Sequence, residues 1–392
     1  MPNENGKYVS PEWFNGGPPA IDADEMNDLS DAIELVVCTE LTVYMADTGT
    51  TVTATDGTAT VTLTEDSGAW TGILPSYGTW TVSGTLDSTS VSVSVEVDAV
   101  KQYSVALVPS SLESTSWSVI STVSQLGLAS NTWAVGDTKS VLIEGTVGTV
   151  EESQTLYVYI IGFDHDNTNG ITFQGFKTAA TYGESVCLVD GHYGSTDAAG
   201  SLWFNMNHWG NYNYGGWKGC DFRYDILGST DIAPSGYGTT ATTGRIGYDA
   251  SSTTATSPVS GTLMAALPSD LRAVMQPMTL YTNNVGNSDT TQSAVTTSVD
   301  YLPLLAEFEI FGVLSSYGAN SYEQDYQLQY EYYSAGNDKI KYQDSNTSTA
   351  ARWFLRSPYR GSGTSFCIVA LSGILTYYSS YTSNGVSPVF TV

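Results

Sequence analysis

Apolar residues alternate with Ser, Thr and Glu over much of the segment 36–108. In the clearest run, residues 91–97, every second residue is a valine. This alternation predicts half-buried strands, because successive side chains of a strand point to opposite faces of a sheet. Turn signals at residues 56–57 and 76–78 separate the runs. Several short strands in one short segment predict an immunoglobulin-like β-sandwich over residues 36–108.

The N-terminal part of the chain has helical spacing instead. Asp22 and Glu25 have the spacing of a capping box, which predicts a short helix that begins there. The apolar residues that follow recur every three or four positions and give this helix one apolar face. Such a face packs either on the following domain or on other copies of the chain, and we expect a homotrimer. We assign residues 1–35 to attachment and oligomerisation, with the apolar face formed by Met26, Leu29 and Ile33.

The remaining segment, residues 109–392, mixes both periodicities and is rich in Gly, Tyr and Trp. We expect helices at residues 117–128 and 268–275, the second capped by Ser269, and strands at residues 156–163, at residues 301–311 and near the C-terminal end. Long polar stretches between these elements indicate loops. The whole chain is therefore predicted to be mainly β, with an α+β C-terminal part.

The amino-acid composition excludes several classes of partner. The 392 residues include 13 Lys and Arg against 40 Asp and Glu, which gives a formal net charge of −27. A chain with this charge repels the phosphates of nucleic acids and the anionic surface of membranes. No apolar run is long enough to span a bilayer, and the N-terminus lacks the basic and apolar regions of a signal peptide. We expect no nucleic-acid partner, no membrane insertion and no secretion signal.

Few residues point to catalysis. The four cysteines are far apart and include no C-x-x-C pair, so we expect buried free thiols rather than a zinc site. The three histidines lie in unrelated contexts and suggest no catalytic triad. These residues are Cys38, Cys187, Cys220 and Cys367, and His165, His192 and His208. The chain is therefore expected not to be an enzyme and to need no cofactor.

One loop, residues 164–170, places oxygen-bearing side chains at alternate positions after a predicted strand, as calcium loops do. It has Asn169 where an EF-hand loop needs Gly, and Gly175 where that loop needs its closing Glu. We interpret the segment as a turn in which Asp and Asn side chains bind their own backbone. No metal site is predicted there.

Two of the six arginines, Arg352 and Arg356, flank a Trp-Phe-Leu segment. A guanidinium binds a carboxylate through two parallel hydrogen bonds, so a structural ion pair is the favoured interpretation. Glu307 and Glu309 are the expected partners, on a predicted strand. Contact with a ligand is the alternative.

The C-terminal segment, residues 359–392, contains no Lys, Glu, Gln, Met, Trp or Asp and combines tyrosines with Ser and Thr. Tyr supplies contact area at low entropic cost, and Ser and Thr supply adaptable hydrogen bonds, as in antibody binding loops. A polar strand pair would have a similar composition. We expect Trp353, Phe366 and Phe390 to belong to the apolar scaffold and the side chains between them to face outward. The predicted receptor-binding residues are Tyr359, Arg360, Thr364, Ser365, Ile368, Ala370, Ile374, Thr376, Tyr377, Tyr378, Ser380 and Tyr381.

Several sequence blocks resemble an uncharacterised domain family that is common in gut Firmicutes and their phages and looks like the C-type-lectin-like fold. The blocks are residues 133–139, 160–166, 216–223, 267–272, 307–312, 353–358 and 385–392. The resemblance implies a C-type-lectin-like domain over residues 109–392. The Glu-Pro-Asn or Gln-Pro-Asp motif of sugar-binding C-type lectins is absent, so calcium-dependent monosaccharide binding is not implied.

Two further segments look like parts of phage proteins. Residues 15–27 are similar to the opening of tailed-phage fibre and baseplate proteins, and residues 77–103 look like their immunoglobulin-like modules. Some lectin-like phage tips are diversified by retroelements whose altered Asn codons cannot encode Lys, Glu, Gln, Met or Trp. Residues 359–392 lack all five types. These resemblances imply a virion protein that is made in the host cytoplasm.

Together these observations predict a non-enzymatic phage fibre or tip protein. The N-terminal segment would contact other virion proteins, the sandwich would serve as a spacer, and the lectin-like domain would bind a protein or glycan receptor on the host surface. One alternative is a passive capsid-decoration or head-fibre protein. The other is a glycan-active enzyme.

Overall fold

The structure is a computed structural model that describes residues 39–392, apart from residues 110, 167–168, 197–198, 232 and 235–253. Strand accounts for 38% and helix for 13% of the structure, so the predicted mainly-β class is confirmed. None of the described helices is long and apolar enough to cross a bilayer.

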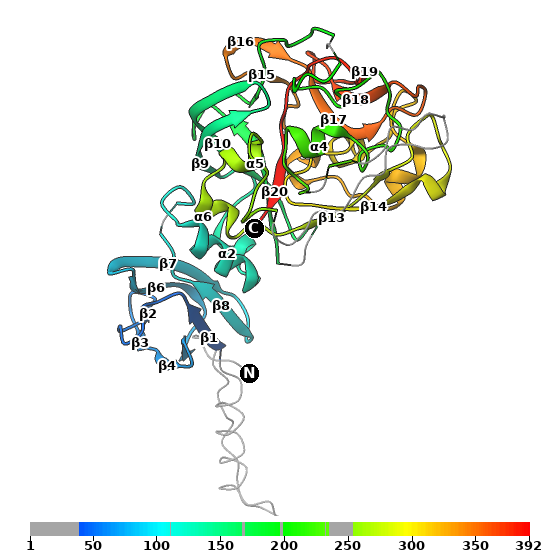
Figure 1. Cartoon of the computed structure of the whole chain (residues 1–392). Coiled ribbons are helices and arrows are strands. Elements are labelled where there is room, and N and C mark those ends of the chain that lie inside the picture. Colours follow the sequence, from blue (N-terminus) through cyan, green and yellow to red (C-terminus); the bar gives the residue numbers. More distant parts are fainter. Residues whose placement is uncertain (1–38, 110, 167–168, 197–198, 232, 235–253) are drawn as a thin grey trace, which may run out of the picture. The chain divides into compact units, whose positions relative to one another are not determined.

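The chain divides into two compact units, Met1–Val119 (unit 1) and Ile120–Val392 (unit 2). Figure 1 colours the described strands of unit 1 in blue to cyan and unit 2 from cyan to red. The division falls within helix α2 (Trp117–Gln125), and the predicted domain limits at residues 35 and 108 stay predictions. The predicted N-terminal helix, with Met26, Leu29 and Ile33, lies outside the described residues.

The described part of unit 1 consists of two four-stranded sheets, with the orders β4-β5-β1-β8 and β3-β2-β6-β7. Strands β1 and β8 are parallel, and the other paired neighbours are antiparallel. Both sheets contribute to one core, which contains the buried Trp70 and Trp80. Two sheets that share a core form a β-sandwich, and the immunoglobulin-like type stays a prediction. The strands are β1 (Thr39–Tyr44), β2 (Thr53–Thr55), β3 (Thr60–Thr62), β4 (Thr64–Asp66), β5 (Ala69–Leu74), β6 (Gly78–Leu86), β7 (Thr89–Val97) and β8 (Gln102–Ala106).

The β6–β7 hairpin shows how local sequence shapes unit 1. Leu86 pairs with Thr89, so Asp87 and Ser88 form a two-residue turn, and their φ angles are 51° and 61°. Turns with positive φ at both positions match the twist of the flanking strands. The backbone amides of Ser88 and Asp87 donate to the carboxylate of Asp47, at 3.1 and 2.9 Å, and these bonds lower the pKa of Asp47.

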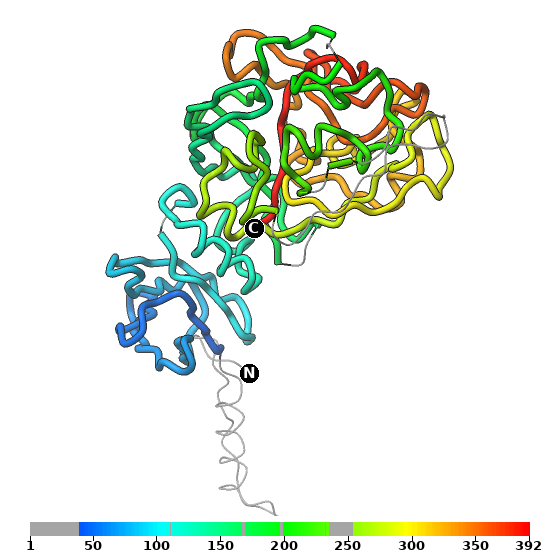
Figure 2. The backbone as a smooth tube through the Cα atoms, viewed as in Figure 1, coloured from blue at the N-terminus to red at the C-terminus, as the bar shows by residue number. Residues whose placement is uncertain are grey.

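Unit 2 contains a four-stranded antiparallel sheet with the order β20-β11-β10-β9. Strand β20 comes from the C-terminal end of the described chain and pairs with β11, so Thr391 lies opposite Thr172. Figure 2 shows this red segment running through the middle of the unit among green segments. The strands are β9 (Thr138–Val147), β10 (Val150–Phe163), β11 (Ile171–Lys177) and β20 (Val389–Thr391).

Unit 2 also contains smaller sheets with the orders β12-β15-β16, β13-β14 and β17-β18-β19. One buried cluster joins Tyr159 of β10 to Trp353 of β17 and Cys367 of β18. These strands are β12 (Val186–Cys187), β13 (Met278–Asn283), β14 (Val295–Asp300), β15 (Lys341–Gln343), β16 (Asn346–Ala351), β17 (Trp353–Pro358), β18 (Ser365–Val369) and β19 (Leu375–Ser379). The helices are α3 (Ala129–Thr132), α4 (Asp221–Asp225), α5 (Leu263–Ala266), α6 (Ser269–Arg272), α7 (Glu307–Phe311) and α8 (Glu331–Ser334), with 3₁₀ turns η1 (Gln292–Ala294) and η2 (Ser321–Asp325).

The predicted elements of this unit are partly right. Helix α2 and strand β10 confirm the expectations at residues 117–128 and 156–163. The expected strand at residues 301–311 is wrong, because its second half is helix α7. The Glu309 carboxylate accepts the amide of Ala306, which satisfies a donor at the start of that helix. Helix α6 forms as expected, but Pro268 rather than Ser269 occupies the N-cap position.

Candidate binding surface

The predicted receptor-binding residues lie on and around the sheet β17-β18-β19. Strand β18 is central and buried along its whole length. Strand β19 is at the edge of this sheet and has only half-buried and exposed residues. Strand β19 therefore supplies the accessible part of the predicted surface.

The expectation that all twelve residues face outward is wrong for Ser365, Ile368 and Ser380, which are buried. Ser365 and Ile368 belong to β18, which is covered on both faces. The amide of Ser380 donates to the carbonyl of Thr364 at 2.9 Å, which holds Ser380 against the neighbouring chain segment. The other nine residues are accessible: Thr364, Ile374 and Tyr377 are exposed, and Tyr359, Arg360, Ala370, Thr376, Tyr378 and Tyr381 are half-buried. The expected scaffold residues Trp353, Phe366 and Phe390 are buried, as predicted.

Tyr377 of β19 stacks on Tyr359. The ring centroids are 3.9 Å apart and the ring planes differ by 6°. Tyr377 is 40% exposed, and Tyr317, which interacts electrostatically with Tyr359, is 64% exposed. Next to Tyr359, the guanidinium of Arg360 donates to the carbonyl of Ser316 at 3.1 Å. The stacking therefore holds the rings of Tyr359 and Tyr377 together at a partly accessible position.

The next residue along β19, Tyr378, packs against Arg352. The guanidinium carbon lies 4.2 Å from the ring centroid of Tyr378 and 5.7 Å from that of Tyr193. The backbone amide of Arg352 donates to the hydroxyl of Tyr193 at 2.6 Å. The Nε atom is buried without a hydrogen-bond partner, and no carboxylate in the described part of the chain pairs with this side chain. Arg352 is therefore held by aromatic rings rather than by an acid.

Arg356 has the opposite environment. It is fully buried, its Nη1 donates to Oε2 of Glu309 at 2.6 Å, and its Nη2 donates to Oε1 of the same carboxylate. Its Nε donates to the hydroxyl of Thr282 at 2.9 Å. The predicted structural ion pair is thus confirmed for Arg356 and Glu309, whereas Glu307 accepts hydrogen bonds from backbone amides instead. Beside this pair, burial raises the pKa of Glu323 to about 7.

The loop at residues 164–170 is held by one internal side-chain hydrogen bond and by others to the surrounding chain, and the Asn169 side chain donates to the carbonyl of Gln125 at 3.2 Å rather than to its own loop. The carboxylate of Asp164 accepts the amide of Gly170 at 3.2 Å, as expected for a turn. The carboxylate of Asp166 accepts the hydroxyl of Tyr330 and lies 3.1 Å from Nδ1 of His165. Residues 167–168 lie outside the described part. Among the residues that the structure describes, no group of three or more His, Cys, Asp or Glu side chains is arranged to hold a metal.

The cysteines agree with the expectation of free thiols. Cys187, Cys220 and Cys367 are buried and form no disulfide. Burial raises the pKa of Cys187 to about 12, so its thiol stays protonated at neutral pH. Cys38 lies outside the described residues.

A cluster of lysines around Tyr159 was not predicted. Lys341 is fully buried and donates to the hydroxyls of Tyr159 and Ser185, both at 2.9 Å. The ammonium of Lys177 lies 4.7 Å from the ring centroid of Tyr159. Burial lowers the pKa of Lys341 to about 7, and burial and the nearby Lys341 lower that of Lys177. No local pattern in the sequence marks this cluster, because Lys341 of β15 is far in the sequence from Tyr159 of β10 and Lys177 of β11.

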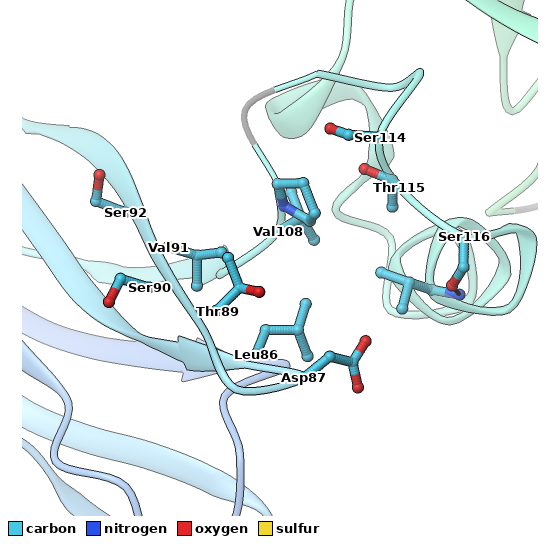
Figure 3. A pocket seen from close by; sticks show the side chains of 12 residues that line it. Leu86, Asp87, Thr89, Ser90, Val91, Ser92, Val108, Ser114, Thr115 and Ser116 are labelled. Carbon is cyan, nitrogen blue, oxygen red and sulfur yellow. Dashed lines mark hydrogen bonds between the residues drawn. The ribbon is translucent and has the colours of Figure 1, made fainter.

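Unit 1 has a pocket of about 540 Å³ beside the β6–β7 turn. Figure 3 shows Thr89, Ser90 and Ser92 on the strand side and Ser114 and Ser116 across from them. Its lining is rich in hydroxyls and includes one carboxylate, that of Asp87. The lining residues include no histidine, cysteine or second acid that would form a catalytic pair. The surface around Tyr359, Tyr377 and Tyr378 of unit 2, called the tyrosine surface below, is therefore the better candidate site.

One comparison with known proteins gives a match. A family described as "Domain of unknown function (DUF6273)" matches residues 201–392. The matched range runs from before α4 to the end of β20 and includes the tyrosine surface. No curated protein and no solved structure matches the chain. The matched description names no activity, so the function has to be argued from the residues themselves.

Proposed function

We propose that this chain is a structural protein of a phage virion, a fibre or tip, that binds a receptor on the host surface through unit 2. The virion setting rests on the sequence resemblances at residues 15–27 and 77–103. The receptor-binding role rests on the stacked pair Tyr359 and Tyr377. Partly exposed rings that are already held in place lose little entropy when a ligand binds, and Tyr is enriched among the residues that dominate binding energy.

The proposal assigns the other segments supporting roles. The apolar face of Met26, Leu29 and Ile33 would join three copies of the chain and anchor them to other virion proteins. The sandwich of unit 1 would act as a spacer. Sedimentation of the full chain tests the homotrimer.

Adhesion to cells tests the receptor-binding role. The labelled full chain is incubated with a panel of gut Firmicutes cells, and its retention is compared with that of Tyr377→Ala. We expect the variant to lose about 1–2 kcal/mol of binding free energy, a decrease in affinity of roughly 5- to 30-fold. Its melting temperature should stay close to that of the unaltered chain, because the side chain is partly exposed.

Tyr182→Ala is the matched control. Tyr182 is a fully exposed tyrosine of the same unit and lies outside the predicted surface, so its loss should leave adhesion unchanged. A folded Tyr377→Ala variant that adheres as well as the original chain would refute the surface assignment. Absence of adhesion to every cell type would instead favour the passive decoration protein.

A further inference from the structure

Arg352 has unused hydrogen-bonding capacity at the edge of the tyrosine surface. A guanidinium carries five N–H donors; the Nε donor of Arg352 has no hydrogen-bond partner, and no carboxylate in the described part of the chain pairs with this guanidinium. Asp and Glu outnumber Lys and Arg by 40 to 13 in this chain, so a partner acid would have been easy to supply. Arg356, four residues further on, shows such a partner in Glu309.

The side chain of Arg352 is partly accessible, although its Nε atom is buried. The ring of Tyr378 covers one side of the guanidinium at 4.2 Å, and the side chain as a whole is half-buried. Gly194 lies beside it with a φ of +81°, and a Cβ atom added there would be only 3.2 Å from Nη2. A glycine at this position therefore keeps space free next to the guanidinium, and its backbone conformation also disfavours a side chain.

Further aromatic side chains are found in the segment that contains Tyr193. Tyr193, which contacts Arg352, follows His192 in the chain, and His192 stacks on Trp203 with ring centroids 3.6 Å apart. His192 is exposed and Trp203 is half-buried. Aromatic faces carry partial negative charge and attract the C–H groups of a sugar ring. A fixed cation beside such rings matches a ligand that combines a carboxylate with a sugar.

We propose that Arg352 binds the carboxylate of an acidic sugar in the host receptor. The inference rests on the proposed function and adds the chemical class of the ligand. The two Nη atoms of the guanidinium would donate two parallel hydrogen bonds to the carboxylate, while Tyr378 keeps the guanidinium in place by a cation–π contact.

The charge of the chain favours this ligand over denser polyanions. A net charge of −27 repels nucleic acids, polyphosphates and strongly acidic peptides, which carry many charges in a short length. Salt screens charge interactions beyond about 8 Å at physiological ionic strength, so an isolated carboxylate in contact with Arg352 is attracted mainly by this residue.

Matched sugar surfaces test the proposal. Biolayer interferometry measures binding of the full chain to surfaces that carry glucuronosides, galacturonosides or sialosides, and to surfaces that carry the corresponding neutral sugars at equal density. We expect binding to at least one acidic surface that is at least tenfold tighter than to its neutral counterpart. Arg352→Gln should abolish this difference, and Arg352→Lys should restore only part of it, because Lys lacks the planar fork of donors.

Lys101→Gln is the control for net charge. It removes one positive charge from an exposed side chain of unit 1 and should leave sugar binding unchanged. Equal binding of the original chain to acidic and neutral surfaces, or binding to none of them, would overturn the proposal even if Arg352→Gln failed to fold. Stronger binding to a surface carrying a glutamate-rich peptide would overturn it as well.

The two proposals fail in different ways. Adhesion to cells that depends on Tyr377 but resists both Arg352→Gln and excess free glucuronate, galacturonate and sialic acid would overturn the sugar carboxylate and leave the receptor-binding role intact. Selective binding to an acidic surface without adhesion to any cell would support the carboxylate site and contradict the proposed function.

Discussion

Arg352 and Arg356 lie four residues apart in the sequence but have opposite environments. Arg356 is buried and forms two hydrogen bonds with Glu309. Arg352 is half-buried, and Tyr193 and Tyr378 surround it. Both arginines belong to one short segment, so the difference comes from the residues that other parts of unit 2 place next to each side chain. Helix α7 places the Glu309 carboxylate next to Arg356, whereas the segments near Arg352 place the rings of Tyr193 and Tyr378 next to it.

Lys341 adds a third case to this comparison. It is as buried as Arg356, but its hydrogen-bond partners are the hydroxyls of Tyr159 and Ser185 rather than a carboxylate. A buried cation without an acid loses its hydration and gains no opposite charge, so its neutral form is favoured. Unit 2 therefore contains three kinds of cation. Arg356 is buried and paired with a carboxylate, Lys341 is buried without one and is easily deprotonated, and Arg352 is partly accessible.

The largest expected effect concerns the paired cation. Arg356→Met should lower the free energy of unfolding by about 3–5 kcal/mol, because the Glu309 carboxylate would stay buried without its partner. Urea unfolding followed by tryptophan fluorescence measures this loss. The double variant Arg356→Met with Glu309→Leu should recover most of it, since the double change removes the uncompensated charge. A double variant as unstable as the single one would show that packing of the Arg356 side chain, and not charge, dominates.

An intermediate effect per pH unit is expected for Lys341, whose contribution to stability depends on pH. The pKa of Lys341 is about 7 in the folded protein and its ordinary value is 10.5. Between these values the unfolded chain holds a proton that the folded protein lacks, so stability increases with pH from about 7 to about 10.5. One such group contributes a slope of at most about 1.4 kcal/mol per pH unit.

The variant Lys341→Met isolates this contribution. Urea unfolding of the original chain and of the variant is compared at several pH values in this range. The variant should lose the slope that Lys341 contributes, so its stability relative to the original chain should be greatest near pH 7 and decrease as pH rises. Parallel pH profiles for the two proteins would mean that Lys341 keeps its charge when buried.

The smallest effect is expected for the accessible cation. Arg352→Gln should lower the free energy of unfolding by only about 0.5–1 kcal/mol, the range of a partly exposed cation–π contact. The same unfolding experiment measures it, with Arg356→Met as the reference for a buried arginine. A loss as large as that of Arg356→Met would show that Arg352 is a structural residue, and the comparison between the two arginines would fail.

Patterns within one segment predicted the local features of this molecule. Alternation at residues 91–97 predicted strand β7, and helical spacing predicted α2. The ion pair of Arg356 with the Glu307–Glu309 segment was expected from the sequence, although Glu309 lies on helix α7 rather than on a strand. The burial of Ile368 was not predictable, because it depends on β18 being central in its sheet. Tyr193 was missed for the same reason, since it reaches Arg352 from a loop 159 residues earlier.

The position of β20 determines when the central sheet of unit 2 can finish folding during synthesis. Residues 172–174 of β11 pair with residues 389–391, so one edge of the central sheet of unit 2 has no partner until almost all of the sequence shown has been synthesised. The described strands of unit 1 pair only with one another and are synthesised before those of unit 2, so all strands of the sandwich are present before unit 2 is complete. Contacts between distant parts of a chain form slowly, and an unpaired sheet edge is prone to associate with other chains. During synthesis the unit proposed to bind the receptor is therefore the one that depends longest on protection from aggregation.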